Sequence, residues 1–174
     1  MALETDFETL VNLYYPSLYR FAFSLTRQES DACDLTQQTF YIWAKKGHQL
    51  LNSAKVKSWL FTTLHREYLQ HRRKSARYTE LDTTQAEQEL SEAPSPPFGT
   101  VDGPAVLNAL GRLDRLFQAP IALFYLEDCS YLEIAQILEI PLGTVKSRIS
   151  RGLTQLQQSL ADPAARLAGK DARE

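Results

Sequence analysis

The chain has 174 residues, enough for one domain or two small ones, and its hydrophobic fraction of 44% is ordinary for a folded globular protein. No apolar run reaches the roughly 18–20 residues that a membrane-spanning helix needs, and the N-terminus MALETDFETL is acidic where a secretory signal would be basic. We therefore expect a cytoplasmic protein without membrane insertion. The formal net charge of -2 is unusual for a protein that grips DNA unaided.

The near-neutral total hides a strong asymmetry along the chain. Residues 45–77 contain nine Lys or Arg and a single acid, Glu67, whereas residues 81–104 contain five acids and no basic residue. A basic block followed by an acidic strip fits a nucleic-acid-binding protein that takes most of its affinity from a larger partner.

The N-terminal third predicts three core-building helices. The first covers residues 4–14, and a second is expected to start at Pro16, where a missing N–H costs nothing, and to run to about Arg27. Ser30 is the expected N-cap of the third helix. Its inner stripe comprises Ala32, Leu35, Thr36, Thr39 and Trp43. Its outward side chains form either plain solvated surface or the footprint of a protein partner; they are Asp31, Asp34, Gln37, Gln38 and Tyr41.

Residues 48–58 lack helical periodicity and predict a loop with a mildly basic rim, which includes Asn52, Lys55 and Lys57. Helical spacing resumes over residues 59–74, WLFTTLHREYLQHRRK. Aromatic rings interleaved with cations are what single-stranded nucleic acid binds, because bases stack on rings while cations follow the backbone. The alternative is that Trp59 and Phe61 are simply core.

Residues 75–104 predict a break between two helical modules. The segment is acidic and contains four prolines, which indicates a flexible, partly extended linker. A helix is then expected over residues 105–117, and Pro120 is expected to start the next. The small, polar stretch after residue 160 is expected to fray.

Residues 125–156 indicate two helices joined by a tight turn. Ser130 and Glu133 form a Ser-x-x-Glu capping box, and Pro141 with Gly143 is expected to interrupt the helix and set up the next. In that last helix an apolar side opposes a polar side that carries no acid. The apolar side consists of Val145, Ile149, Leu153 and Leu156, and the polar side of Thr144, Ser147, Arg148, Ser150, Arg151 and Thr154, with Lys146 at its edge. Arg and short hydroxyls in this arrangement suit a helix in the DNA major groove, although a solvated amphipathic helix has the same pattern.

No catalytic, cofactor or metal site is indicated. Cys33 and Cys129 lie far apart without a CxxC partner, and His65 and His71 are spaced for different helical faces. Neither a Gly-rich phosphate loop nor a nucleophile elbow occurs.

Taken together, residues 5–160 resemble the extracytoplasmic-function (ECF) sigma factors of bacterial RNA polymerase. DACDLTQQTFYIWAK resembles the family's polymerase-clamp helix, SWLFTTLHREYLQHRRK its promoter-melting and minus-ten helix, and YLEDCSYLEIAQILEIPLGTVKSRISRGLTQL its minus-thirty-five helix-turn-helix. The resemblance implies an all-α fold of two small helical domains joined by a flexible acidic linker, the C-terminal domain carrying the helix-turn-helix. It places the first domain at residues 1–77, the linker at 78–104, the second domain at 105–160 and a polar tail at 161–174.

The resemblance also implies partners and site residues. The partners are core RNA polymerase, promoter DNA and, on family grounds alone, an anti-sigma factor. The polymerase-binding residues would be Asp31, Asp34, Leu35, Gln37, Gln38, Phe40 and Tyr41. The minus-ten residues would be Asn52, Lys55, Lys57, His65, Arg66, Arg72, Arg73 and Lys74, and the minus-thirty-five residues Thr144, Lys146, Ser147, Arg148 and Arg151.

The sequence departs from the family pattern at Cys33 and Gln38, where acids are frequent, and at the run His65-Arg66-Glu67. The individual clamp contacts and the minus-ten preference are therefore not transferred from the family. The main competing hypothesis is a stand-alone helix-turn-helix regulator whose first module senses a ligand or dimerises.

Overall fold

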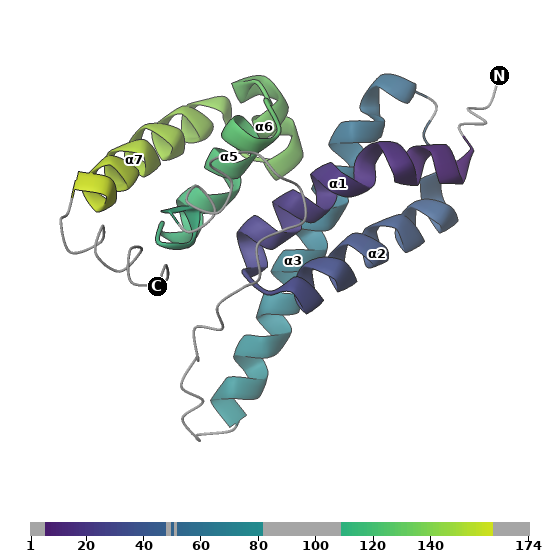
Figure 1. The fold of residues 1–174 in the computed structure, drawn as a ribbon, viewed down its shortest axis with the longest axis horizontal. Helices are drawn as coiled ribbons and strands as arrows, with labels where there is room; N and C mark the ends of the chain where they lie inside the picture. The colour runs from purple at the N-terminus through teal and green to yellow at the C-terminus, as the bar shows by residue number, and fades with distance from the viewer. Residues whose placement is uncertain (1–5, 48–49, 51, 82–108, 162–174) are drawn as a thin grey trace, which may run out of the picture. The chain divides into compact units, whose positions relative to one another are not determined.

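A computed structural model describes residues 6–47, 50, 52–81 and 109–161, and every element in these ranges is helical. The chain divides into two compact units, residues 1–94 and residues 95–174. Figure 1 colours them from the purple N-terminus to the yellow end of the last described helix. The expected linker residues 82–104 and tail residues 162–174 lie outside the described ranges.

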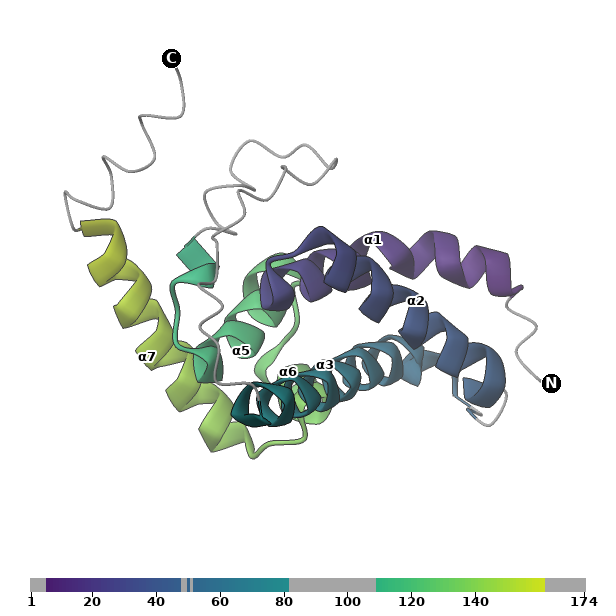
Figure 2. The ribbon, with the colours of Figure 1, turned by 90° about the horizontal axis from the view of Figure 1, so that it is seen from below.

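The first unit consists of α1 (Phe7–Thr26), α2 (Glu29–Lys46), the 3-10 turn η2 (Ser53–Lys55) and α3 (Val56–Leu81). All three helices contact one another, and α3 extends as a long rod past α1 and α2 (Figures 1 and 2). Phe21 of α1 and Phe61 of α3 meet at the centre of this unit with ring centroids 5.5 Å apart, and both are completely buried. Two buried threonines of α2 satisfy their hydroxyls by donating to carbonyls one turn earlier, Thr36 to Ala32 and Thr39 to Leu35.

The prediction of two helices before Arg27 is wrong, because α1 is one helix with Pro16 inside it. A proline inside a helix removes one hydrogen bond and costs about 3 kcal/mol. Leu10 and Leu18, on either side of Pro16, are both buried against the core. Packing of one continuous apolar stripe offsets the local penalty. Asn12, whose carbonyl loses its partner, is exposed, where water can replace the missing N–H.

Three other helix boundaries also differ from the predictions. The N-cap of α2 is Gln28 rather than Ser30, because Arg27 adopts a left-handed conformation (φ 61°) and lets the chain re-enter a helix at Glu29. The loop expected up to residue 58 ends earlier, because Asn52 caps η2 by accepting a hydrogen bond from the Ala54 N–H (3.0 Å), and α3 follows at Val56. At its other end α3 continues to Leu81, beyond the expected start of the linker at residue 78.

The second unit contains α5 (Arg115–Leu126), α6 (Tyr131–Leu138) and α7 (Leu142–Ala161). Its core is aliphatic and includes Ile121 and Leu123 of α5, Ile134 of α6, and Val145 and Ile149 of α7. Pro120 does not start a helix as expected. The chain instead turns before Asp114, α5 begins at Arg115, and Pro120 is buried inside it.

Candidate functional site

The start of α6 has the geometry that its sequence predicts. The Ser130 hydroxyl accepts a hydrogen bond from the Glu133 N–H (3.3 Å), and the Glu133 carboxylate accepts one from the Ser130 N–H (2.7 Å). The capping box is therefore confirmed, and it fixes where the first helix of the helix-turn-helix begins.

The turn between α6 and α7 is made by a residue that the sequence did not single out. Glu139 ends α6 in the left-handed conformation (φ 56°), and the Ala135 carbonyl accepts a hydrogen bond from the Ile140 N–H (3.2 Å). Pro141 precedes α7, and its carbonyl accepts from the N–H groups of Thr144 and Val145. The expectation that Gly143 helps to interrupt the helix is wrong, because none of the described glycines has positive φ and Gly143 lies in the first turn of α7.

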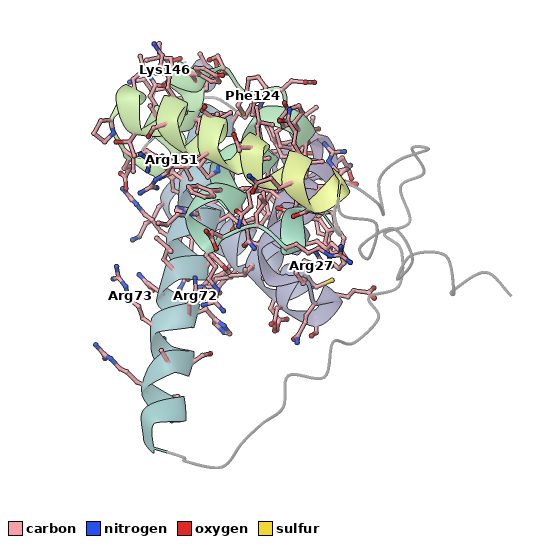
Figure 3. The ribbon with its side chains drawn as sticks, turned by 90° about the vertical axis from the view of Figure 1, so that its left-hand side faces the viewer. Arg27, Arg72, Arg73, Phe124, Lys146 and Arg151 are labelled. Atoms are coloured by element: carbon pink, nitrogen blue, oxygen red, sulfur yellow. The ribbon has the colours of Figure 1, made fainter. Side chains whose placement is uncertain are left out.

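α7 presents the polar face that the sequence predicts. Lys146, Ser147 and Arg151 are exposed, while Thr144 and Arg148 are half-buried at the edge of the face. Val145 and Ile149 are buried on the opposite side, at 0% and 1% exposure, and hold α7 in the second unit. Figure 3 shows Lys146 and Arg151 at different heights along α7. All five predicted minus-thirty-five residues thus lie on one helix.

One residue essential to the placement of α7 was missed. Gly152 is buried at the contact of α7 with α5, and a Cβ atom there would collide with the Ile121 Cδ1 and lie 3.0 Å from the Phe117 Cβ. The sequence did contain an indication of this role, because a glycine within the apolar stripe of a helix often marks a position where another backbone approaches closely.

α3 divides the predicted minus-ten residues between two faces. His65 and Arg72 lie on the side of Tyr68, whose hydroxyl donates to the Leu25 carbonyl of α1 (3.3 Å) and whose ring lies 5.8 Å from the Arg72 guanidinium carbon. Arg66 and Arg73 are exposed and seven residues apart, on a different face. Figure 3 shows Arg72 and Arg73 leaving α3 in different directions.

The helix also brings residues outside the predicted set onto the Arg66–Arg73 face. Arg77 follows Arg73 by four residues, one helical turn, and is exposed. The four-residue spacing indicated this, but the helix was expected to end at Lys74, so Arg77 was left out of the predicted set. Asn52 and Lys55 are exposed beside the start of α3, Lys57 is half-buried within its first turn, and Lys74 is exposed further along.

The predicted polymerase-binding residues of α2 also fall on two faces. Leu35 and Phe40 are buried, at 7% and 5% exposure. They therefore pack α2 against the core and are not accessible to a polymerase surface. Asp34, Gln37, Gln38 and Tyr41 instead line one shallow surface hollow, because residues three, four and seven apart share a helical face. Asp31 is half-buried one turn before them.

Aromatic packing keeps this helix firmly against α1. The Phe40 ring stacks on Tyr15 at 6.2 Å, and Tyr15 stacks on Tyr19 at 6.2 Å. Burial raises the pKa of the Tyr15 hydroxyl above its ordinary value, and the neighbouring Cys33 raises it further by charge repulsion and a hydrogen bond. At the exposed end, the Lys45 ammonium lies 4.3 Å from the centre of the Tyr41 ring, a cation–π contact that orders the exposed tyrosine.

The described residues contain no group of three or more His, Cys, Asp or Glu that could hold a metal ion. Within the same ranges, no helix has both the length and the apolar character needed to cross a bilayer.

The two units match different parts of one protein family. The family model of Sigma-70 region 2 matches residues 10–78, and that of Sigma-70 region 4 matches residues 104–156. The ECF RNA polymerase sigma factor SigE of Mycolicibacterium smegmatis is 32% identical over 167 residues, which cover 94% of this chain and 65% of SigE. The sigma factor RpoE of Bartonella quintana, solved in complex with the anti-sigma factor NepR, is 30% identical with a TM-score of 0.79 over 91% of this chain and 98% of RpoE. The chain belongs to the ECF sigma factors.

Other relatives agree with this assignment. The sigma factor SigV of Bacillus subtilis is 27% identical to this sigma factor, over 87% of the chain and 89% of SigV. CnrH, solved in complex with the cytosolic domain of CnrY, shares the fold at 22% identity, with a TM-score of 0.65 over 88% of the chain and 86% of CnrH. The all-α fold of regions 2 and 4 is thereby confirmed, and the competing hypothesis of a stand-alone regulator is not favoured.

Proposed function

We propose that this sigma factor binds core RNA polymerase and directs it to promoters, the first unit engaging the polymerase clamp and minus-ten DNA and the second unit reading the minus-thirty-five element. The observation that carries the proposal is the acid-free polar face of α7, held outward by a buried opposite face. Arg side chains on such a face can form paired hydrogen bonds with guanine, while Ser and Thr hydroxyls reach phosphates.

The α2 surface formed by Asp34, Gln37, Gln38 and Tyr41 is the proposed polymerase-binding face. Its exposed polar groups and single ordered aromatic ring suit a protein interface better than a nucleic-acid interface, because a carboxylate there would repel phosphate. Leu35 and Phe40 contribute by holding the helix in place.

For α3 we propose that its two faces bind different parts of the minus-ten DNA. Arg66, Arg73 and Arg77 would follow a phosphate backbone, because they lie along one exposed side of the helix. His65 and Arg72, beside the anchored Tyr68, would face bases or the opposite strand. Asn52, Lys55, Lys57 and Lys74 would extend this basic surface.

The proposal includes three properties of the whole protein. It acts in the cytoplasm, where its polymerase and DNA partners are found. It is an initiation factor without catalytic activity or cofactor of its own. A protein anti-sigma factor holds it inactive, as the RpoE complex with NepR suggests for a protein 30% identical to this one.

The decisive experiment changes Arg148 and Arg151 to alanine, separately and together. Each substitution is expected to weaken promoter binding by the purified holoenzyme by about 1–3 kcal/mol if the lost contact is to a base edge. Run-off transcription with purified core polymerase provides the readout, and Gln157→Ala, on an exposed position later in α7, is the matched control. Wild-type transcription by the double variant would refute the assignment. Tight and specific DNA binding by the chain without polymerase would favour the stand-alone regulator instead.

A further inference from the structure

Gly152 lies where α7 crosses α5, on the side of the helix that also carries the buried Val145 and Ile149. An added Cβ would collide with the Cδ1 methyl of Ile121, lie 3.0 Å from the Phe117 Cβ and lie 3.3 Å from the Ile121 Cγ1. The Ile121 methyl ends a side chain and can rotate away. The Phe117 Cβ is bonded to the α5 backbone, so it moves only with the helix. Accommodating a Cβ atom at position 152 therefore requires α5 and α7 to move apart by a few tenths of an ångström.

The side chains that depend on this separation belong to the reading face. Arg151 immediately precedes Gly152, and Arg148 lies one helical turn earlier. The N-terminal half of α7 is anchored in the second unit, because Val145 and Ile149 are buried and the Pro141 carbonyl accepts two hydrogen bonds from the first turn. A push at position 152 consequently changes the tilt of α7 as a whole, and with it the positions of Arg148 and Arg151. Functional geometry of this kind tolerates only about 0.5 Å and 10–20° of error.

We infer that Gly152 is a positioning residue for minus-thirty-five recognition, which sets the tilt at which α7 presents Arg148 and Arg151. It contacts no DNA itself and belongs to no predicted site. This inference rests on the proposed reading of DNA by α7. It predicts that a methyl group on the buried side of the helix alters sequence discrimination on the exposed side.

The test compares Gly152→Ala, Ile121→Val and the double variant, each as full chain bound to core polymerase. Valine lacks the Cδ1 atom that the new Cβ would meet, so Ile121→Val relieves the main collision while the Phe117 contact remains. The probe is a pool of duplexes with a randomised segment about 10 base pairs long, one turn of DNA, at the minus-thirty-five position. The wild-type holoenzyme first defines the preferred sequence. Each variant then chooses between that sequence and a scrambled duplex in one tube, so that the ratio bound does not depend on the fraction of folded protein.

Gly152→Ala is expected to lower the discrimination ratio about tenfold, equivalent to about 1.4 kcal/mol. The ratio of Ile121→Val should stay at the wild-type value, and the double variant should fall between the two. A merely structural role would reduce thermal stability and leave the ratio unchanged, and that result would overturn the inference. If Gly152→Ala fails to fold, the double variant is compared with Ile121→Val, where a lower ratio supports the inference and an equal ratio overturns it. A wild-type holoenzyme without any minus-thirty-five preference would instead overturn the proposed function itself.

Discussion

Glu139 offers a direct test of the turn between α6 and α7. It holds a left-handed backbone conformation (φ 56°, ψ 43°), which costs a residue with a Cβ about 1–2 kcal/mol and costs glycine almost nothing. Glycine also lowers the free energy of unfolding by about 0.5–1 kcal/mol relative to alanine, because it makes the unfolded chain more flexible. Glu139→Gly should therefore make the second unit more stable than Glu139→Ala by about 0.5–1 kcal/mol. Alanine is the right comparison, because both variants lose whatever contacts the glutamate side chain makes.

The assay is thermal unfolding of the full chain, followed by calorimetry and by tryptophan fluorescence. For a domain of this size the difference between the two variants corresponds to roughly 2–8 °C in Tm. Both tryptophans, Trp43 and Trp59, belong to the first unit, so their fluorescence transition should not move. Gln136→Gly is the matched control, because it places glycine at an exposed position inside α6 and should cost about 1 kcal/mol. A Glu139→Gly variant no more stable than Glu139→Ala would refute the left-handed turn.

Three further predictions address the rest of the molecule. Gln38→Lys or Tyr41→Ala should reduce capture of core polymerase in a pull-down without changing the circular dichroism spectrum, and wild-type capture by both would refute the α2 interface. Ser130→Ala should destabilise the second unit by about 1 kcal/mol in calorimetry, because α6 loses its N-cap, and an unchanged transition would contradict the capping role. Burial, followed by the effect of Cys33, raises the pKa of the Tyr15 and Tyr19 hydroxyls above 10.0, so their contribution to stability is complete below about pH 10 and is lost as the pH rises further. If both tyrosines are replaced with phenylalanine, the first unit should lose less stability between neutral and alkaline pH than it does in the wild-type chain. An equally large loss in the double variant would contradict ionisation of these tyrosines as the cause.

The sequence predicted local features whose cause lies in neighbouring residues. The Ser130–Glu133 capping box and the two-sided character of α7 both follow from residues within two turns of each other, and both are present in the structure. The family resemblance likewise required only short motifs in the correct order. The individual DNA and polymerase contacts remain predictions, because they depend on partners that the chain does not contain.

The wrong predictions concern positions where packing outweighs local preference. Pro16 and Pro120 were expected to begin helices, yet each lies inside one, because residues on both sides of it belong to a single buried stripe. Leu35 and Phe40 were included in the polymerase-binding set on the family resemblance alone, although helical periodicity had already placed Leu35 in the inner stripe of its helix. The helical period sends these two side chains to the core instead.

The sequence by itself determined the helical class, the order of the two units, the N-cap of α6 and the acid-free face of α7, because short-range hydrogen bonds and periodicity decide these features. Only the tertiary structure decided that Phe40 of α2 is buried, that Glu139 makes the turn, and that Gly152 allows α7 to approach α5. These outcomes depend on contacts between residues distant in sequence, such as Gly152 with Ile121 and Phe117, and local patterns carry no information about such distances.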